Sequence, residues 1–251
     1  MASRHAAHVF ASLLKGTVPD RGLDEIAVGV EKHRKEIQRM LGESKRTGDV
    51  KFLRGGYGCG KTFMATLAVQ DAQEAKFVTS FVVVSDNDPG LLWLFTGTPT
   101  FFDDRRGVKG LEPLYDRIKF ESFGGVASLR QPQLDLKPFD RERLVKVALK
   151  VRSLHPDLSP EEGEARLTRA FIEQLADKVT EGFRGDVGVV PRQFLRTFAN
   201  ILDIVANDPD QDPFKLLGFE PRDLTPEESA VMEGRPLEAP DDRFGGGSLE
   251  M

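Results

Sequence analysis

Residues 50–62, which read VKFLRGGYGCGKT, decide the fold of this 251-residue chain. The first part, residues 50–54, is short and rich in apolar residues, as is typical of a buried strand. The next part, residues 55–62, matches the pattern G-x-x-x-x-G-K-[ST], and the apolar positions from 62 to 75 repeat with the period of a helix. The order of strand, glycine loop and helix predicts a phosphate-binding P-loop.

The residue types of this loop suit a nucleoside triphosphate. Gly55, Gly58 and Gly60 allow the chain to curl so that its backbone N–H groups converge on one point. Lys61 supplies a positive charge for the β- and γ-phosphates, and the Thr62 hydroxyl is placed to coordinate Mg²⁺ at a helix N-terminus. We therefore expect ATP with Mg²⁺ as the ligand. The residues expected to contact it here are Gly55, Gly56, Tyr57, Gly58, Cys59, Gly60, Lys61, Thr62 and Phe63.

The bulk composition is that of a soluble globular protein. Hydrophobic residues make up 39% of the chain and charged residues 30%. No apolar stretch approaches the length of a membrane span, and the N-terminus lacks the pattern of a secretory signal, so we expect a cytoplasmic protein with no membrane partner. Cys59 is the only cysteine, which excludes an internal disulfide and a cysteine-based zinc site.

The net charge argues against non-specific nucleic-acid binding. It is −5 at pH 7, with a pI of about 5.5. A local basic patch is an alternative, although we favour a solvated helix face. Its members would be Arg34, Lys35, Arg39, Lys45 and Arg46.

The pattern along the chain predicts an α/β fold, with the P-loop on a parallel sheet and a helical lid subdomain towards the C-terminus. The expected domains are residues 1–136 for nucleotide binding, 137–218 for the lid and 219–251 for a flexible tail that is loose from Thr225. The expected elements are a short helix at 4–15, a surface helix at 26–41 that stops at Gly42, strands at 50–54, 77–84 and 91–96, and helices at 62–75, 141–153, 160–182 and 191–206.

The junction between the strands at 77–84 and 91–96 is too short for a parallel crossover, which needs a dozen or more residues. Either the two strands form an antiparallel hairpin, or a segment has been lost here; we favour loss. The same region lacks the hydrophobic strand ending in Asp-Glu that would hold Mg²⁺ and orient the attacking water. Asp86 and Asp88 are the nearest substitutes, and a plain turn explains them better.

Three further residues, with Lys61, form the expected catalytic set. Thr96 ends the strand at 91–96 and could sense the γ-phosphate. Arg117 could reach the nucleotide of a neighbouring subunit, although a surface ion pair is the alternative. Arg192 follows Pro191 at a helix start and could contact the γ-phosphate from the lid, with Arg196 as the alternate one turn later.

With these residues in place, the chain resembles AAA+-type ATPases of the branch that includes origin-recognition and STAND proteins. Residues 26–31, IAVGVE, are similar to the adenine-side element of that branch, which implies that Val28 and Gly29 contact the nucleotide; Val30 stands where the branch has Arg. Residues 134–139 resemble its entry into the lid, and residues 190–192 resemble the start of its sensor-2 helix.

Residues 52–62 and 94–99 look like the D-type ATP-binding protein of bacteriophage-exclusion (BREX) systems, and that resemblance covers most of residues 4–220. It implies ATP binding, and by analogy a role in phage defence, with self-association or other defence-system proteins as partners. The Walker B strand and the helical insertion of that family are missing here, at the junction between Asp88 and Pro89.

Three functions therefore compete. The first is an ATPase-type switch of an anti-phage defence complex. The second is a non-hydrolysing, nucleotide-dependent scaffold, which the missing acidic residues favour. The third, a small-molecule P-loop kinase, needs an acceptor site and an Arg-rich lid that the sequence does not reveal.

Overall fold

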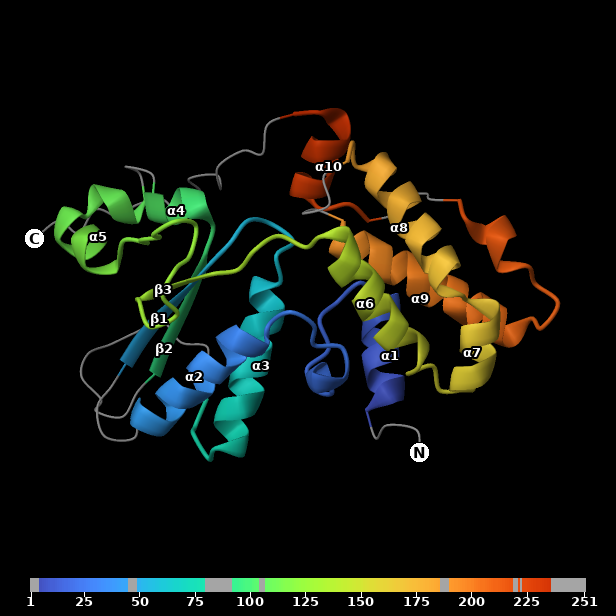
Figure 1. The fold of residues 1–251 in the computed structure, drawn as a ribbon, viewed down its shortest axis with the longest axis horizontal. Coiled ribbons are helices and arrows are strands. Elements are labelled where there is room, and N and C mark those ends of the chain that lie inside the picture. The colour runs from blue at the N-terminus through green and yellow to red at the C-terminus, as the bar shows by residue number, and fades with distance from the viewer. Residues whose placement is uncertain are drawn as a thin grey trace, which may run out of the picture.

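The computed structural model describes residues 5–44, 49–79, 92–103, 107–185, 190–218, 221 and 223–235. Within these residues the chain forms a small sheet part and a larger helical part, which lie side by side (Figure 1). The strands are β1 (Asp49–Arg54), β2 (Leu92–Gly97) and β3 (Gln133–Asp135). The helices are α1 (Ala6–Leu14), α2 (Glu31–Ser44), α3 (Lys61–Glu74), α4 (Pro99–Asp103), α5 (Glu112–Ile118), α6 (Arg141–Arg152), α7 (Pro160–Arg166), α8 (Arg169–Gly182), α9 (Pro191–Asn207) and α10 (Pro226–Glu233).

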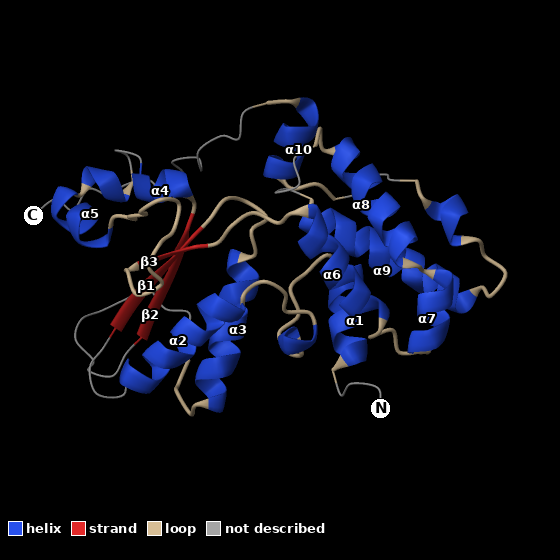
Figure 2. Cartoon of the chain, viewed as in Figure 1, coloured by secondary structure: helices blue, strands red, loops and turns tan. Residues whose placement is uncertain are grey.

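The described strands form one parallel sheet in the order β2-β1-β3 (Figure 2). Leu53 of β1 pairs with Thr96 of β2 on one side and with Leu134 of β3 on the other. The ends of β1 and β2 are tied together where the glycine loop begins, because the Gly55 N–H donates to the carbonyl oxygen of Gly97 at 3.3 Å. The predicted α/β class, with a parallel sheet, is confirmed at this level.

The sheet is covered on both faces, because successive residues of a strand point to opposite sides. Leu53 belongs to a buried cluster with Ile37 of α2 and Met64 of α3. The neighbouring residue, Phe52, packs on the other face against a smaller cluster that contains Phe102 of α4. The start of α3 is thereby fixed at the end of β1, where the glycine loop lies.

The helical part is built around α9, whose large apolar side chains are mostly buried. Phe194, Phe198 and Leu202 are fully buried there. Helices α6 and α8 pack on α9, and so does α1 from the start of the chain. Because α1 lies in this core, residues from the predicted nucleotide-binding domain contribute to the helical part; the predicted boundaries themselves stay a prediction.

Two predicted helices have other bounds than expected. The helix expected at 26–41 begins only at Glu31, because Gly29 has a φ of +72° and cannot continue a helix. It also runs past Gly42 to Ser44, so Gly42 is not its end. The helix expected at 160–182 is two helices, since the Thr168 side chain accepts a hydrogen bond from the Phe171 N–H and caps a new start.

The expectation of a loose tail from Thr225 is wrong for residues 225–235. Thr225 caps α10 in a reciprocal capping box with Glu228, and Gly234 ends the helix with a φ of +71°. Residues 236–251 lie outside the described residues. The strand expected at 77–84 also falls mostly outside them, and the described residues 77–79 have no regular structure. No helix in the described part is long and apolar enough to cross a membrane.

Candidate functional site

Two glycines of the glycine loop adopt a left-handed backbone. Gly58 and Gly60 have φ values of +74° and +89°, a region that residues with a Cβ rarely adopt. Gly55 is required for a different reason, because a Cβ there would lie 2.4 Å from Cys59 Sγ and 2.8 Å from the Leu136 carbonyl oxygen. A Cβ at Gly56 would meet nothing within 4 Å.

Lys61 and Thr62 begin α3 directly after this loop. The Lys61 ammonium donates to the carbonyl oxygens of Gly55 and Gly56 at 2.9 and 2.7 Å. No side chain caps the N-terminus of α3, so the N–H groups of its first turn are open to an anion. Cys59 is buried, and burial raises the pKa of its thiol, which keeps it protonated and unreactive at neutral pH.

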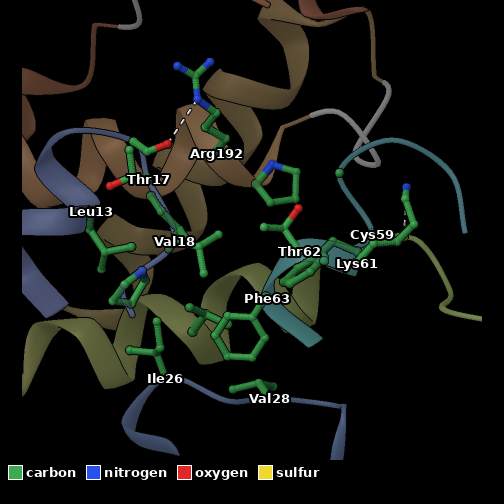
Figure 3. Close-up of a pocket in the computed structure, with 18 of the residues that line it drawn as sticks. Leu13, Thr17, Val18, Ile26, Val28, Cys59, Lys61, Thr62, Phe63 and Arg192 are labelled. Carbon is green, nitrogen blue, oxygen red and sulfur yellow. Dashed lines mark hydrogen bonds between the residues drawn. The ribbon is translucent and has the colours of Figure 1, made fainter. Parts of the chain in front are cut away.

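A pocket of about 370 Å³ opens between this loop and the helical part. Residues 57–63 form one wall of the pocket. The opposite wall is mainly apolar, with Val28 at its base in the view of Figure 3. The rest of the lining comes from α1 and the loop after it, from the segments just before α2 and α6, and from α6 and α9: Leu13, Gly16, Thr17, Val18, Pro19, Ile26, Val30, Phe139, Val147, Pro191, Arg192 and Leu195. The pocket therefore combines a phosphate-type loop with an apolar wall suited to a base.

The predicted adenine-side segment lies at this apolar wall. Val28 lines the pocket, whereas Gly29 does not; its N–H donates to Glu31 Oε1 at 3.0 Å. The pKa of Glu31 is lowered, chiefly by hydrogen bonds from its own backbone N–H and from Gly29. Lys150 of α6 donates to the Ala27 carbonyl oxygen at 2.7 Å. The segment is thus attached to the helical part by its backbone.

Arg192 lines the pocket, but its guanidinium points away from Lys61 and Thr62 (Figure 3). Its Nε donates to the Gly16 carbonyl oxygen at 3.2 Å, and one terminal nitrogen lies 3.0 Å from Glu228 Oε2. The alternate residue, Arg196, pairs with Asp223 at 2.5 Å. In this structure both arginines are therefore held by groups of the chain itself.

Thr96 and Arg117 lie outside the pocket lining. Thr96 is exposed at the end of β2, in register with Leu53 and next to Gly97, which bonds the start of the glycine loop. Arg117 is exposed on α5, on the side of the sheet away from α3, and has no ion-pair partner among the described residues. The structure thus brings Thr96 near the loop and leaves Arg117 at the outer surface.

Two described acidic residues lie beside the end of β1. Asp135 ends β3 in register with Arg54, with Arg54 Nε 3.9 Å from its carboxylate. Asp103 pairs with the same arginine at 2.6 Å. Asp86 and Asp88 lie outside the described residues, as does the junction with Pro89. Among the described residues, no cluster of three or more His, Cys, Asp and Glu could hold a metal ion.

Two described members of the predicted basic patch, Arg34 and Arg39, are paired, and Lys35 is exposed on the same helix. Arg34 binds Asp71 of α3 at 2.6 Å and also contacts Asp24. Arg39 binds Glu36 at 2.8 Å and also contacts Glu43. Lys45 and Arg46 lie outside the described residues. Arg34 thus joins α2 to α3, whereas Arg39 pairs within α2; the pairing of both arginines disfavours a nucleic-acid surface here.

Sequence reasoning missed the part of the pocket that comes from the N-terminus. Leu13 and the loop 16–19 line it because α1 packs on α9, a contact between residues far apart in the chain. It also missed α10, whose start reads Thr-Pro-Glu-Glu at 225–228. This is a visible capping-box signal, and the same pattern starts α7 as Ser-Pro-Glu-Glu at 159–162.

Comparison with known proteins gives one family. The family model described as "BREX system ATP-binding protein BrxC/D" matches residues 1–90 and, in a second segment, residues 85–221. The two segments meet at residues 85–90, the junction at which the sequence predicts a missing stretch. No curated protein and no solved structure matches the chain.

Proposed function

We propose that this chain, which belongs to the BrxC/D family of BREX system ATP-binding proteins, binds ATP with Mg²⁺. The site is the pocket between the glycine loop and the helical part. In this proposal it has an AAA+-like P-loop fold and acts as a nucleotide-responsive switch of an anti-phage defence complex. Its partners would be further copies of itself or other proteins of that system, in the cytoplasm.

The observation that carries the proposal is the pairing of a phosphate cradle with an apolar wall in one pocket. Gly58 and Gly60 adopt the left-handed backbone that turns the loop around an anion. Lys61 already lies over that loop, bound to carbonyl oxygens that a phosphate would replace. Thr62 lines the pocket and would place its hydroxyl on Mg²⁺, and Mg²⁺ would offset the charge of the phosphates.

Lys61→Ala tests nucleotide binding directly. The change removes the ammonium that faces the β- and γ-phosphates, so we expect ATP affinity to fall by roughly 10- to 100-fold. The measurement is a titration with a fluorescent ATP analogue. Lys146→Ala is the matched control, because Lys146 is an exposed lysine on α6 that does not line the pocket. Equal affinity of the two variants would contradict the proposed site.

Phosphate release separates the switch from the scaffold. The second candidate, a nucleotide-dependent scaffold without turnover, is favoured by the ion pairs of Asp103 and Asp135. Asp103 pairs with Arg54, Asp135 pairs with Lys137 at 2.7 Å and lies 3.9 Å from Arg54, and neither carboxylate lines the pocket. An ATPase requires phosphate release that Lys61→Ala abolishes. ATP binding without any such release would support the scaffold and reject the ATPase switch for this chain.

A further inference from the structure

Glu228 is the only described glutamate whose side chain is fully buried. It lies on α10, and its Oε2 accepts hydrogen bonds from Arg192 at 3.0 Å and from Gln193 at 2.9 Å. The same oxygen accepts from the Thr225 N–H at 3.0 Å. Within the described residues, its Oε1 has no hydrogen-bond partner. Arg192 is therefore the cation that balances a charge buried beneath α10.

The start of α10 also touches the glycine loop. The Thr225 hydroxyl lies 2.9 Å from the Tyr57 hydroxyl, and Tyr57 lines the pocket. Just before α10, the Asp223 carbonyl oxygen accepts a hydrogen bond from Arg192 at 3.0 Å. Residues 223–228 thus contact both walls of the pocket, the loop through Tyr57 and α9 through Arg192.

Arg192 cannot bind Glu228 and a terminal phosphate in the pocket at the same time. If the guanidinium turns into the pocket towards a terminal phosphate, it leaves the Glu228 carboxylate. A buried carboxylate that has lost its cation is strongly destabilising. The fully buried position of Glu228 can then be kept only at a large free-energy cost, so α10 is expected to leave α9 and let the carboxylate reach water.

We propose that α10 is a latch that responds to the nucleotide: Glu228 holds Arg192 in the empty protein, and a triphosphate takes Arg192 and releases α10. This inference rests on the proposed ATP site. A diphosphate lacks the terminal phosphate and leaves the latch closed. Release of α10 would also break the contact between Thr225 and the Tyr57 hydroxyl, so the loop and the C-terminal helix change together.

Hydrogen exchange of residues 225–234 tests the latch in the nucleotide-free protein. Arg192→Gln and Glu228→Gln each remove one charge of the pair, and we expect the amides of α10 to exchange at least about tenfold faster in both. Glu228→Gln keeps an acceptor for Gln193 and for the cap. Asp177→Asn is the matched control, because it takes the carboxylate from another arginine, Arg141, at a surface site on α8. It should leave α10 unchanged.

Nucleotides test the response of the wild-type protein. We expect the analogue AMP-PNP to raise exchange of α10 to the level of Glu228→Gln, and ADP to leave it unchanged. Glu228→Gln should also bind AMP-PNP about tenfold more tightly than the wild type does, with ADP affinity within about twofold, because the phosphate no longer competes for Arg192.

Binding of both nucleotides is measured alongside, so that two failures can be told apart. If AMP-PNP binds and α10 exchange stays the same, the latch is overturned and the ATP site stands. If neither nucleotide binds, the proposed function fails, and the latch fails with it.

Discussion

Compared with the sheet part, the helical part encloses its large apolar side chains far more completely. Phe171, Phe194 and Phe198 are fully buried in the helical core. In the sheet part, Phe95 at the end of β2 is 41% exposed, and Phe123 is 80% exposed. The core around α9 therefore supplies most of the hydrophobic stabilisation, and the glycine loop lies at the border between the two parts.

The largest expected effect contrasts the same substitution in the two parts. Phe171→Ala should lower the free energy of unfolding by about 3–5 kcal/mol, because it leaves a cavity in the helical core. Phe123→Ala should change it by less than about 0.5 kcal/mol, since most of that side chain is in water. Urea denaturation measures both. Equal losses would contradict the contrast between the two parts; if Phe171→Ala does not fold, Phe171→Leu gives a smaller loss of the same sign.

A smaller effect is expected within the loop itself. Gly55→Ala should destabilise the protein by roughly 1–3 kcal/mol, because the new methyl group meets Cys59 Sγ and the Leu136 carbonyl oxygen. Gly56→Ala should stay within about 0.5 kcal/mol of the wild type, because its methyl group meets open space. Thermal unfolding of the two variants checks this difference. Equal melting temperatures of the two variants would contradict the close contacts at Gly55.

The smallest expected effect is a dependence of the free energy of unfolding on pH. It comes from two histidines, one in each part. Burial lowers the pKa of His155 in the helical part and of His33 in the sheet part below 6.5. The Asp157 N–H also donates to His155 Nδ1 at 3.2 Å, which requires that nitrogen to be unprotonated. The unfolded chain takes up these protons first, so stability is full above pH 6.5 and falls as the pH drops through 6.5.

Each histidine contributes at most about 1.4 kcal/mol per pH unit to this fall. His155→Gln and His33→Gln should each make the dependence on pH shallower between pH 7.5 and 5.5. Urea midpoints measured across this range check the expectation. If stability rose as the pH dropped, the neutral state of the two rings would be contradicted.

The strand and the helix on either side of the glycine loop were predicted from the sequence because their signal is local. The spacing of Gly55, Gly58, Gly60 and Lys61 is set within eight residues, and the strand and helix on either side have the expected pattern. The core helix α9 was predicted almost to the residue for the same reason, since its apolar period of 3.6 is continuous. The parallel pairing of β1 with β2 agrees with the expected sheet.

Contacts between distant residues could not be predicted in the same way. Arg192 was identified from its place after Pro191, but its partner Glu228 lies 36 residues later. The α7–α8 break depended on Thr168, whose capping role competes with an otherwise continuous helical period. The walls contributed by Leu13 and by the loop 16–19 depend on the packing of α1 against α9, which no local pattern indicates.

The position of α1 also bears on how the molecule can be divided. Val9, Phe10 and Leu13 fill the helical core, while the chain that follows them crosses to the sheet before it returns through α6. A truncated protein that begins near residue 137 would therefore lack α1 and expose the apolar surface of the helical core that α1 covers. We expect that fragment to aggregate unless a peptide of residues 5–30 is supplied. We therefore expect the two parts to fold as one unit.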